Sequence, residues 1–290
     1  MYHQPILIKE FLSFFSEQKI YRYIDGTIGS GGHAYAILEA HPEIEKLYGF
    51  DHDPYAIEIA AAKLEPFKKK VILIQANVKD FCKYISEPVE GIFLDLGVSS
   101  MQLDSPERGF SFYHEGPLDM RMNPQSNLDA KMVINTYSEK DLGRIFHEYG
   151  EEPRWRMAAR AIVKARNKKP IKTTTDLVEV LKNTITRRKG KKIHPMTLVF
   201  QALRIYVNDE LKGLTQVLPK GIESLVSKGR LGVLAFHSLE DRIVKHLFRD
   251  YALEKGMVKV LTKKPIVTGS EEIKNNPRSR SAKLRFIEKI

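Results

Sequence analysis

A glycine-rich segment near the N-terminus constrains the fold more than any other feature of this chain. A short Tyr-Ile-Asp run at residues 23–25 is followed within seven residues by Gly26, Gly29, Gly31 and Gly32. Helix-forming residues come next. A strand, a tight loop and a helix start in this order are typical of a nucleotide-type binding turn, because glycine lets the main chain bend and lets a ligand approach closely.

The glycine spacing argues against a phosphate ligand. It departs from the G-x-G-x-x-G pattern, and no Gly-Lys-Ser/Thr follows it. Pyrophosphate prefers a helix N-terminus without acidic neighbours, whereas Asp25 ends the strand here. The loop therefore suits a cationic or hydroxyl-bearing ligand. The alternative is a glycine turn that only links a strand to a helix.

Polar residues follow the ends of three further strands, which we expect at residues 46–50, 71–75 and 91–94. Asp51, Asn77 and Asp95 stand at or just beyond these ends. Ligands of open parallel sheets bind outside the carboxyl ends of the strands, and an acidic residue about 20 positions after a glycine loop is placed to bind ribose hydroxyls. One such residue is more often a turn or cap residue. Four strand ends with polar residues, Asp25 included, favour a binding site.

The alternation of strands and helices stops after Ser100 and resumes with a strand at 229–236. Between these points we expect helices that begin near residues 127, 138, 155 and 175, and a long amphipathic helix over 197–218. The pattern predicts an α/β fold whose parallel sheet is interrupted by an all-helical insert. We assign residues 1–103 and 219–290 to the sheet domain and 104–218 to the insert.

The net charge of +11 is concentrated in two segments. Residues 151–195 contain fourteen Lys or Arg against four Asp or Glu, and residues 255–290 contain ten against three. Clustered positive charge indicates a nucleic-acid partner, RNA or DNA. A solvated charged face is the alternative. The densest run comprises Arg187, Arg188, Lys189, Lys191 and Lys192.

The remaining composition predicts a cytoplasmic protein. Cys82 is the only cysteine, so an internal disulfide is excluded. The nine histidines lack the spacing of metal ligands, and we expect no metal site. No apolar run approaches the roughly 18 residues of a membrane span, and no leader pattern is expected at the N-terminus.

S-adenosylmethionine fits these features because it carries no phosphate. Its ribose suits Asp51, its adenine suits the tip at Asn77 and Val78, and its methionine part suits residues 31–33. Asp95 would then face the methyl group. With the main-chain carbonyls that follow it, Asp95 could accept N–H bonds from an exocyclic base amine and localise the nitrogen lone pair for attack. The alternative role for Asp95 is a turn cap or a second ligand contact.

Several long motifs resemble those of the bacterial 16S ribosomal RNA cytosine N4-methyltransferase family. Examples are Asp-Leu-Gly-Val-Ser-Ser at 95–100 and Phe-His-Ser-Leu-Glu-Asp-Arg at 236–242. The other segments are 25–27, 31–33, 102–104, 108–112, 116–122 and 277–285. The resemblance spans nearly the whole chain. It implies a class I (Rossmann-like) methyltransferase sheet with an inserted helical, RNA-recognition domain.

The resemblance also implies the ligands. The methyl donor would be S-adenosylmethionine, and the substrate a P-site cytosine in the decoding region of 16S rRNA, presented as RNA or as the small ribosomal subunit. The implied cofactor contacts are Gly31, Gly32, His33, Asp51, Val78, Asp95 and Gln102. Val78 stands where the family commonly has phenylalanine, and Phe81 follows three residues later. Asp95 is the catalytic candidate. Residues 108–122 either shape the pocket for the target base or pack the insert.

Three other functions are alternatives. A non-catalytic RNA-binding assembly factor could retain a vestigial pocket. A DNA base-amine methyltransferase is less consistent, because Leu96-Gly97-Val98 replaces the expected Pro-Pro-Tyr. An NAD-dependent oxidoreductase fits the loop spacing poorly. No membrane partner is expected, and a homodimer is one expectation for the assembly.

Overall fold

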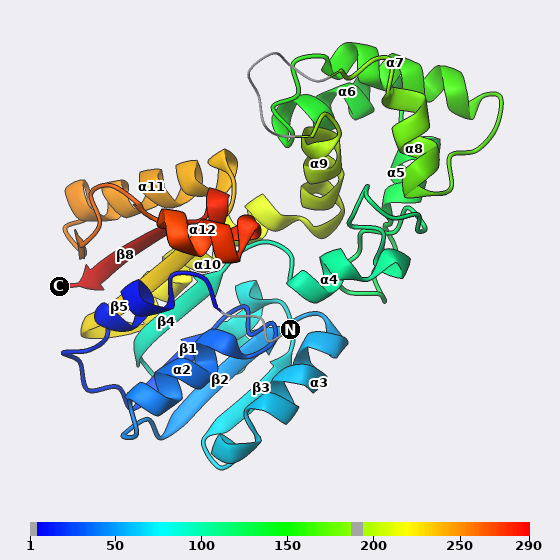
Figure 1. The fold of residues 1–290 in the computed structure, drawn as a ribbon. Helices are drawn as coiled ribbons and strands as arrows, with labels where there is room; N and C mark the ends of the chain where they lie inside the picture. Colours follow the sequence, from blue (N-terminus) through cyan, green and yellow to red (C-terminus); the bar gives the residue numbers. More distant parts are fainter. Residues whose placement is uncertain (1–4, 187–193) are drawn as a thin grey trace. The chain divides into compact units, whose positions relative to one another are not determined.

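The computed structural model describes residues 5–186 and 194–290 (Figure 1). The chain forms two compact units. The sheet unit comprises Met1–Gly97 and Leu211–Ile290, and the insert unit comprises Val98–Glu210. The insert was expected at 104–218, and its C-terminal bound lies earlier because the helix after residue 210 packs in the core of the sheet unit. The basic run at 187–192 lies outside the described residues.

Five parallel strands form the main part of the sheet, in the order β3-β2-β1-β4-β5. Their bounds are β1 Arg22–Asp25, β2 Lys46–Asp51, β3 Val71–Gln75, β4 Val89–Asp95 and β5 Leu225–Ala235. The strands expected from the sequence are therefore present, and β4 and β5 are neighbours although the insert separates them in the chain. Because the strands are parallel, the carboxyl ends of β1, β2 and β4 lie at one edge.

An antiparallel extension completes the sheet and was not expected from the sequence. It consists of β6 Val258–Val260, β7 Ile266–Val267 and β8 Lys283–Lys289. β8 pairs antiparallel with β5, from Arg230 opposite Glu288 to Ala235 opposite Lys283. The sheet is thus mixed, and β5 is not left as an open edge.

Side chains alternate between two apolar cores, one on each face of the sheet. In β4, Ile92 and Leu94 belong to one core and Phe93 to the other, as the period of two in a strand requires. Phe93 belongs to the core that also contains residues of α1 Ile8–Ser13, α2 Gly32–Ala40 and α3 Pro54–Lys63. The opposite core contains α10 Glu210–Ser224 and α11 Ser238–Leu253. Both faces are covered, which explains why the strands are apolar on both sides.

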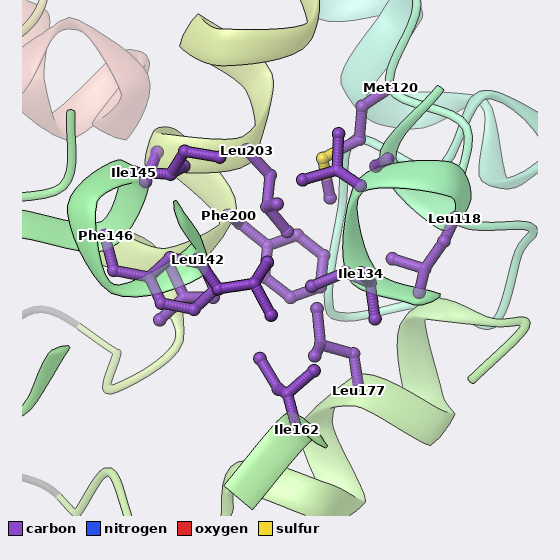
Figure 2. Close-up of a cluster of buried hydrophobic side chains, with 14 of the residues drawn as sticks. Leu118, Met120, Ile134, Leu142, Ile145, Phe146, Ile162, Leu177, Phe200 and Leu203 are labelled. Carbon is purple, nitrogen blue, oxygen red and sulfur yellow. The ribbon is translucent and has the colours of Figure 1, made fainter. Parts of the chain in front are cut away.

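The insert unit is helical and has its own apolar core. Its helices are α4 Ser100–Asp104, α5 Ala130–Thr136, α6 Glu139–Glu148, α7 Trp155–Arg166, α8 Thr174–Leu181 and α9 Thr197–Asn208. Figure 2 shows side chains of α5, α6, α7 and α8 meeting around Phe200 of α9. Ser138 caps α6 as expected, because its Oγ accepts the N–H of Asp141 at 3.1 Å.

The long helix expected over 197–218 is two helices. α9 ends at Asn208, Asp209 adopts a left-handed conformation (φ 52°), and α10 begins at Glu210. A left-handed residue cannot continue an α-helix, so one amphipathic pattern spans two elements. Short elements complete the fold: η1 Glu65–Phe67, η2 Val78–Lys83, η3 Pro106–Arg108, α12 Ser270–Asn275 and η4 Pro277–Ser281. No helix within the described ranges is both long enough and apolar enough to span a bilayer.

The pairing of β5 with β8 generates a stability prediction. Gly232 lies opposite Phe286, and a Cβ on Gly232 would overlap the Phe286 ring. That ring is itself stacked on Phe14, with centroids 4.3 Å apart. Gly232→Ala should therefore lower the free energy of unfolding by about 1–3 kcal/mol through overpacking.

The matched control is Gly213→Ala in α10, where an added Cβ meets nothing within 4 Å. Here alanine should stabilise by about 0.5–1 kcal/mol, because it restricts the unfolded chain. Thermal and urea unfolding of the two variants should shift in opposite directions. Equal shifts of the same sign would contradict the packing described for Phe286.

Candidate ligand site at the strand tips

Main-chain hydrogen bonds hold the glycine loop against the neighbouring strands. Gly26 N–H donates to the carbonyl of Phe93 at 2.8 Å, and Ile28 N–H donates to the carbonyl of Phe50 at 2.7 Å. Gly29 and Gly31 have positive φ values of 49° and 75°, which favour glycine. The loop is therefore fixed to β4 and β2 at the same time, and α2 starts directly after it.

Asp51, at the end of β2, holds this loop in place through side-chain hydrogen bonds. Its carboxylate accepts the N–H of Gly29 at 3.1 Å and the N–H of Asp53 at 2.9 Å. The side chain is only partly buried. Burial raises the pKa of Asp51, although the two N–H donors oppose this rise. A carboxylate has about four lone-pair sites, so two of them remain for hydroxyl groups of a ligand.

Asp25 at the end of β1 is buried, with 2% of its surface exposed. Its carboxylate accepts the N–H of Thr27 at 3.2 Å. Burial raises the pKa of Asp25 to about 7, against the effects of His33 and of the Thr27 N–H, and the charges of Asp95 and Asp51 add to the rise. The group therefore titrates near neutral pH.

Asp95 ends β4, and its side chain is 31% exposed. Its N–H donates to Thr27 Oγ1 at 2.6 Å, and its Oδ2 lies 3.4 Å from His33 Nδ1. The His33 side chain is buried, so its ring does not face the loop surface. A ligand could meet His33 and Gly32 through the first N–H groups of α2, which lack partners within the helix.

The segment after β3 shows which of Val78 and Phe81 could contact a ligand. Asn77 caps η2 by accepting the N–H of Lys79 at 3.1 Å. Phe81 is 2% exposed and lies in the core beneath the sheet, so its ring is not available to a ligand. Val78 is partly exposed. A Cβ added to Gly26 would lie only 2.7 Å from Val78 Cγ2, so the Val78 side chain lies directly against Gly26. Of the two, only Val78 borders the glycine loop.

Gln102 belongs to the insert unit and not to the cluster of strand tips in the sheet unit. It forms a capping box with Ser99: its Oε1 accepts the Ser99 N–H at 3.0 Å, and its own N–H donates to Ser99 Oγ. The segment 108–122 likewise has a packing role, because several of its side chains lie in the core of the insert: Phe110, Leu118, Met120 and Met122.

Some residues of this site were not identified from the sequence. Thr27 joins Asp25 to Asp95 through its N–H and hydroxyl. Its position inside the glycine loop and within the family-like segment 25–27 were the available signals. The carbonyl of Ile6 accepts from His33 Nε2 at 3.1 Å. No sequence motif identifies a main-chain carbonyl as a hydrogen-bond acceptor, so this contact can be found only from the folded structure.

Some basic side chains of the two positively charged segments make contacts within the protein, and others are exposed to solvent. Arg166 donates to the carbonyls of Ile134 and Tyr137, and Lys283 and Arg285 both bind the carboxylate of Asp241. These ion pairs lower the pKa of Asp241 despite its burial. The exposed charges include the α7 basic stripe, which we define as Arg156, Arg160 and Lys164.

The spacing of four residues places the α7 basic stripe on one face of the helix. The Arg156 guanidinium lies 4.1 Å from the Trp155 ring centroid. Arg160 Nε is 3.6 Å from Glu139 Oε1, in a pair whose side chains are 79% and 47% exposed. Such an exposed pair contributes little, so this arginine remains available to an anion.

The raised pKa of Asp25 gives a pH dependence of stability. Between about pH 4 and 7 the folded chain keeps a proton on Asp25 that the unfolded chain releases, so stability falls as the pH rises through this range. Asp25→Asn is neutral at every pH and can still accept from Thr27. Its stability relative to the parent should rise by about 2 kcal/mol between pH 5 and pH 8.

Urea unfolding at several pH values measures this difference. The exposed Glu58 provides the control, because Glu58→Gln should leave the pH profile unchanged. A gap between Asp25→Asn and the parent that stays constant from pH 5 to pH 8 would show that Asp25 is ionised in the fold throughout.

Known proteins share this fold. A solved protein from Clostridium thermocellum that carries an rRNA-methylase assignment matches 99% of this chain and 100% of its own, with a TM-score of 0.50 and 14% identity. The similarity supports the fold, a class I methyltransferase sheet.

Sequence relatives are much closer. Proteins named ribosomal RNA small subunit methyltransferase H are 49% identical in Protochlamydia amoebophila, over 99% of this chain and 97% of the relative, and 47% identical in Chlamydia caviae, over 99% and 98%. The family model described as the MraW methylase family matches residues 1–290. The resemblance found in the motifs is confirmed, and this chain belongs to the MraW methylase family.

Proposed function

We propose that this enzyme transfers a methyl group from S-adenosylmethionine to the exocyclic N4 amine of a decoding-region cytosine in 16S rRNA. The observation that carries the proposal is the set of carboxylates at the tips of β1, β2 and β4 around a glycine loop with left-handed turns. The full-length membership of a methylase family supports the reaction class.

The residues at the tips fit this donor. Their polar groups are carboxylates, which favour ribose hydroxyls and the cationic sulfonium and ammonium groups of the donor and disfavour phosphate. Asp51 would bind the ribose with its remaining lone pairs. Val78 would cover the adenine, and Gly31, Gly32 and the main chain of His33 would hold the methionine part. Gln102 stays a predicted donor contact. When bound, S-adenosylmethionine supplies an electrophilic methyl group on sulfur.

Asp95 would act on the acceptor. The lone pair of an exocyclic cytosine amine is delocalised into the ring, so the nitrogen is a weak nucleophile. A carboxylate that accepts one of its N–H bonds localises the lone pair on nitrogen and fixes the direction of the amine. Asp95 has the required exposure at the end of β4, and among the described residues its Oδ1 has no hydrogen-bond partner.

The α7 basic stripe supports an RNA substrate. Three exposed cations on one helix face can neutralise phosphates that follow one another along a strand. The relatives are named for the small-subunit ribosomal RNA, so we propose the same substrate class here. Such a substrate would place the enzyme in the cytoplasm. Assembly as a homodimer stays a prediction.

The direct test supplies methyl-labelled donor with small ribosomal subunits, naked 16S rRNA or duplex DNA. Nucleosides are then separated by mass spectrometry. We expect labelled N4-methylcytidine in ribosomal RNA. Label in DNA alone would favour the DNA base-amine methyltransferase. The absence of both label and donor binding by calorimetry would favour the non-catalytic assembly factor.

The role of the α7 basic stripe can be tested with a triple variant, Arg156→Gln, Arg160→Gln and Lys164→Gln. If each cation contacts one phosphate, the slope of log affinity against log salt should become shallower by about 2–3. Binding to small subunits or rRNA fragments over a salt series measures this slope.

The control removes equal charge from the sheet unit by Lys9→Gln, Lys68→Gln and Lys69→Gln, all exposed lysines. This variant should keep most of the parent slope. An equal loss in both variants would mean that net charge, and not the α7 basic stripe, determines RNA affinity.

A further inference from the structure

His33 is held in an unusually specific position for a residue of a glycine loop. Its ring is 6% exposed and packs between two phenylalanines, with centroid distances of 5.0 Å to Phe11 and 4.8 Å to Phe93. The first belongs to α1 and the second to β4. Both ring nitrogens nevertheless face oxygen atoms.

The partners of the two nitrogens determine where the protons are. Nε2 lies 3.1 Å from the carbonyl oxygen of Ile6, which can only accept, so Nε2 must carry a proton. Nδ1 lies 3.4 Å from Asp95 Oδ2. When Asp95 is ionised it can also only accept, and Nδ1 then carries a second proton. The geometry therefore favours an imidazolium paired with a carboxylate.

We propose that His33 is a positioning residue for Asp95, whose Oδ2 it holds through Nδ1–H so that Oδ1 is presented to the acceptor amine. This inference rests on the proposed function, because it assigns Asp95 the amine. It gives the His33 side chain a role distinct from contact with the methyl donor. The Ile6 carbonyl and the two phenylalanine rings fix the imidazole, and the imidazole fixes the carboxylate.

The charges around the ring agree with this arrangement. Asp95 faces it from β4 and Asp25 from β1, and Asp51 acts on Asp25 in turn. Burial alone lowers the pKa of His33, but the hydrogen bond and charge of Asp95, the charge of Asp25 and the Ile6 carbonyl together raise it above its usual value. A protonated His33 donates through Nδ1–H to Asp95 Oδ2 and thereby leaves Oδ1 to accept an N–H of the amine.

Two variants with amide side chains, His33→Asn and His33→Gln, test the contact of His33 with Asp95 separately from its contact with Ile6. In His33→Asn the side-chain amide stands near the place of Nδ1 and can donate to Asp95. In His33→Gln it stands near the place of Nε2 and can reach only Ile6. Single-turnover methyl transfer should fall by about 100-fold in His33→Gln, the cost of a misplaced catalytic group, and by no more than about 10-fold in His33→Asn.

Donor affinity should stay within about threefold in both variants, because the ring does not face the donor. The alkaline limb of the parent rate profile, where His33 loses its Nδ1 proton, should be absent from His33→Asn, since an amide does not titrate. A rate in His33→Gln equal to that of the parent, or equal losses in the two variants, would overturn the positioning role.

A second readout needs neither donor nor RNA. In the full chain labelled with ¹⁵N-histidine, the ring nitrogens of His33 report its titration by NMR. Asp95→Asn should lower the pKa of His33 by about one unit, because it removes the paired charge. An unchanged titration would show that the pair does not form, even if the variants at position 33 fail to fold. If the pair is present but the parent transfers no methyl group, the proposed function fails and the pairing stands.

Discussion

The hydrogen bonds between the glycine loop and the neighbouring strands are the constraint on which the site depends. The loop donates to main-chain carbonyls of β2 and β4 and to the carboxylates of Asp25 and Asp51. Each carboxylate is thereby held by the loop that it anchors. Three like charges at one edge would repel one another, and the N–H donors and His33 offset this repulsion. The same contacts that organise the main chain set the ionisation of the site.

Much of this arrangement could be predicted because it follows from local patterns. Short runs rich in apolar residues that end in Asp25, Asp51 and Asp95 indicate strands and their tips, and a parallel sheet brings the tips together. Contacts that depend on the packed fold could not be predicted. Phe81 and Val78 are both apolar and close in sequence, yet only the packing of η2 decides which is buried. Likewise, Asp209 interrupts an amphipathic pattern that continues through it.

The number of basic residues in a segment does not show where their side chains lie in the fold. The two basic segments were identified by counting, but Arg166, Lys283 and Arg285 serve internal contacts with carbonyls or with Asp241. Counting cannot separate such residues from those that face solvent. The regular spacing along α7 is informative where the count is not, because a stripe on one helix face offers several cations to a single strand of phosphates.

The adjacency of β4 and β5 has a consequence for how the protein folds during its synthesis. β4 ends at Asp95 and β5 begins at Leu225, so the ribosome must make the whole insert before the next strand of the sheet exists. At about 5–20 residues per second this takes on the order of 10 s. Throughout that time β4 has an unpaired edge, while the insert, which has its own core, can already fold. The insert is thus complete before the sheet closes, and the last strand made, β8, seals the edge of β5.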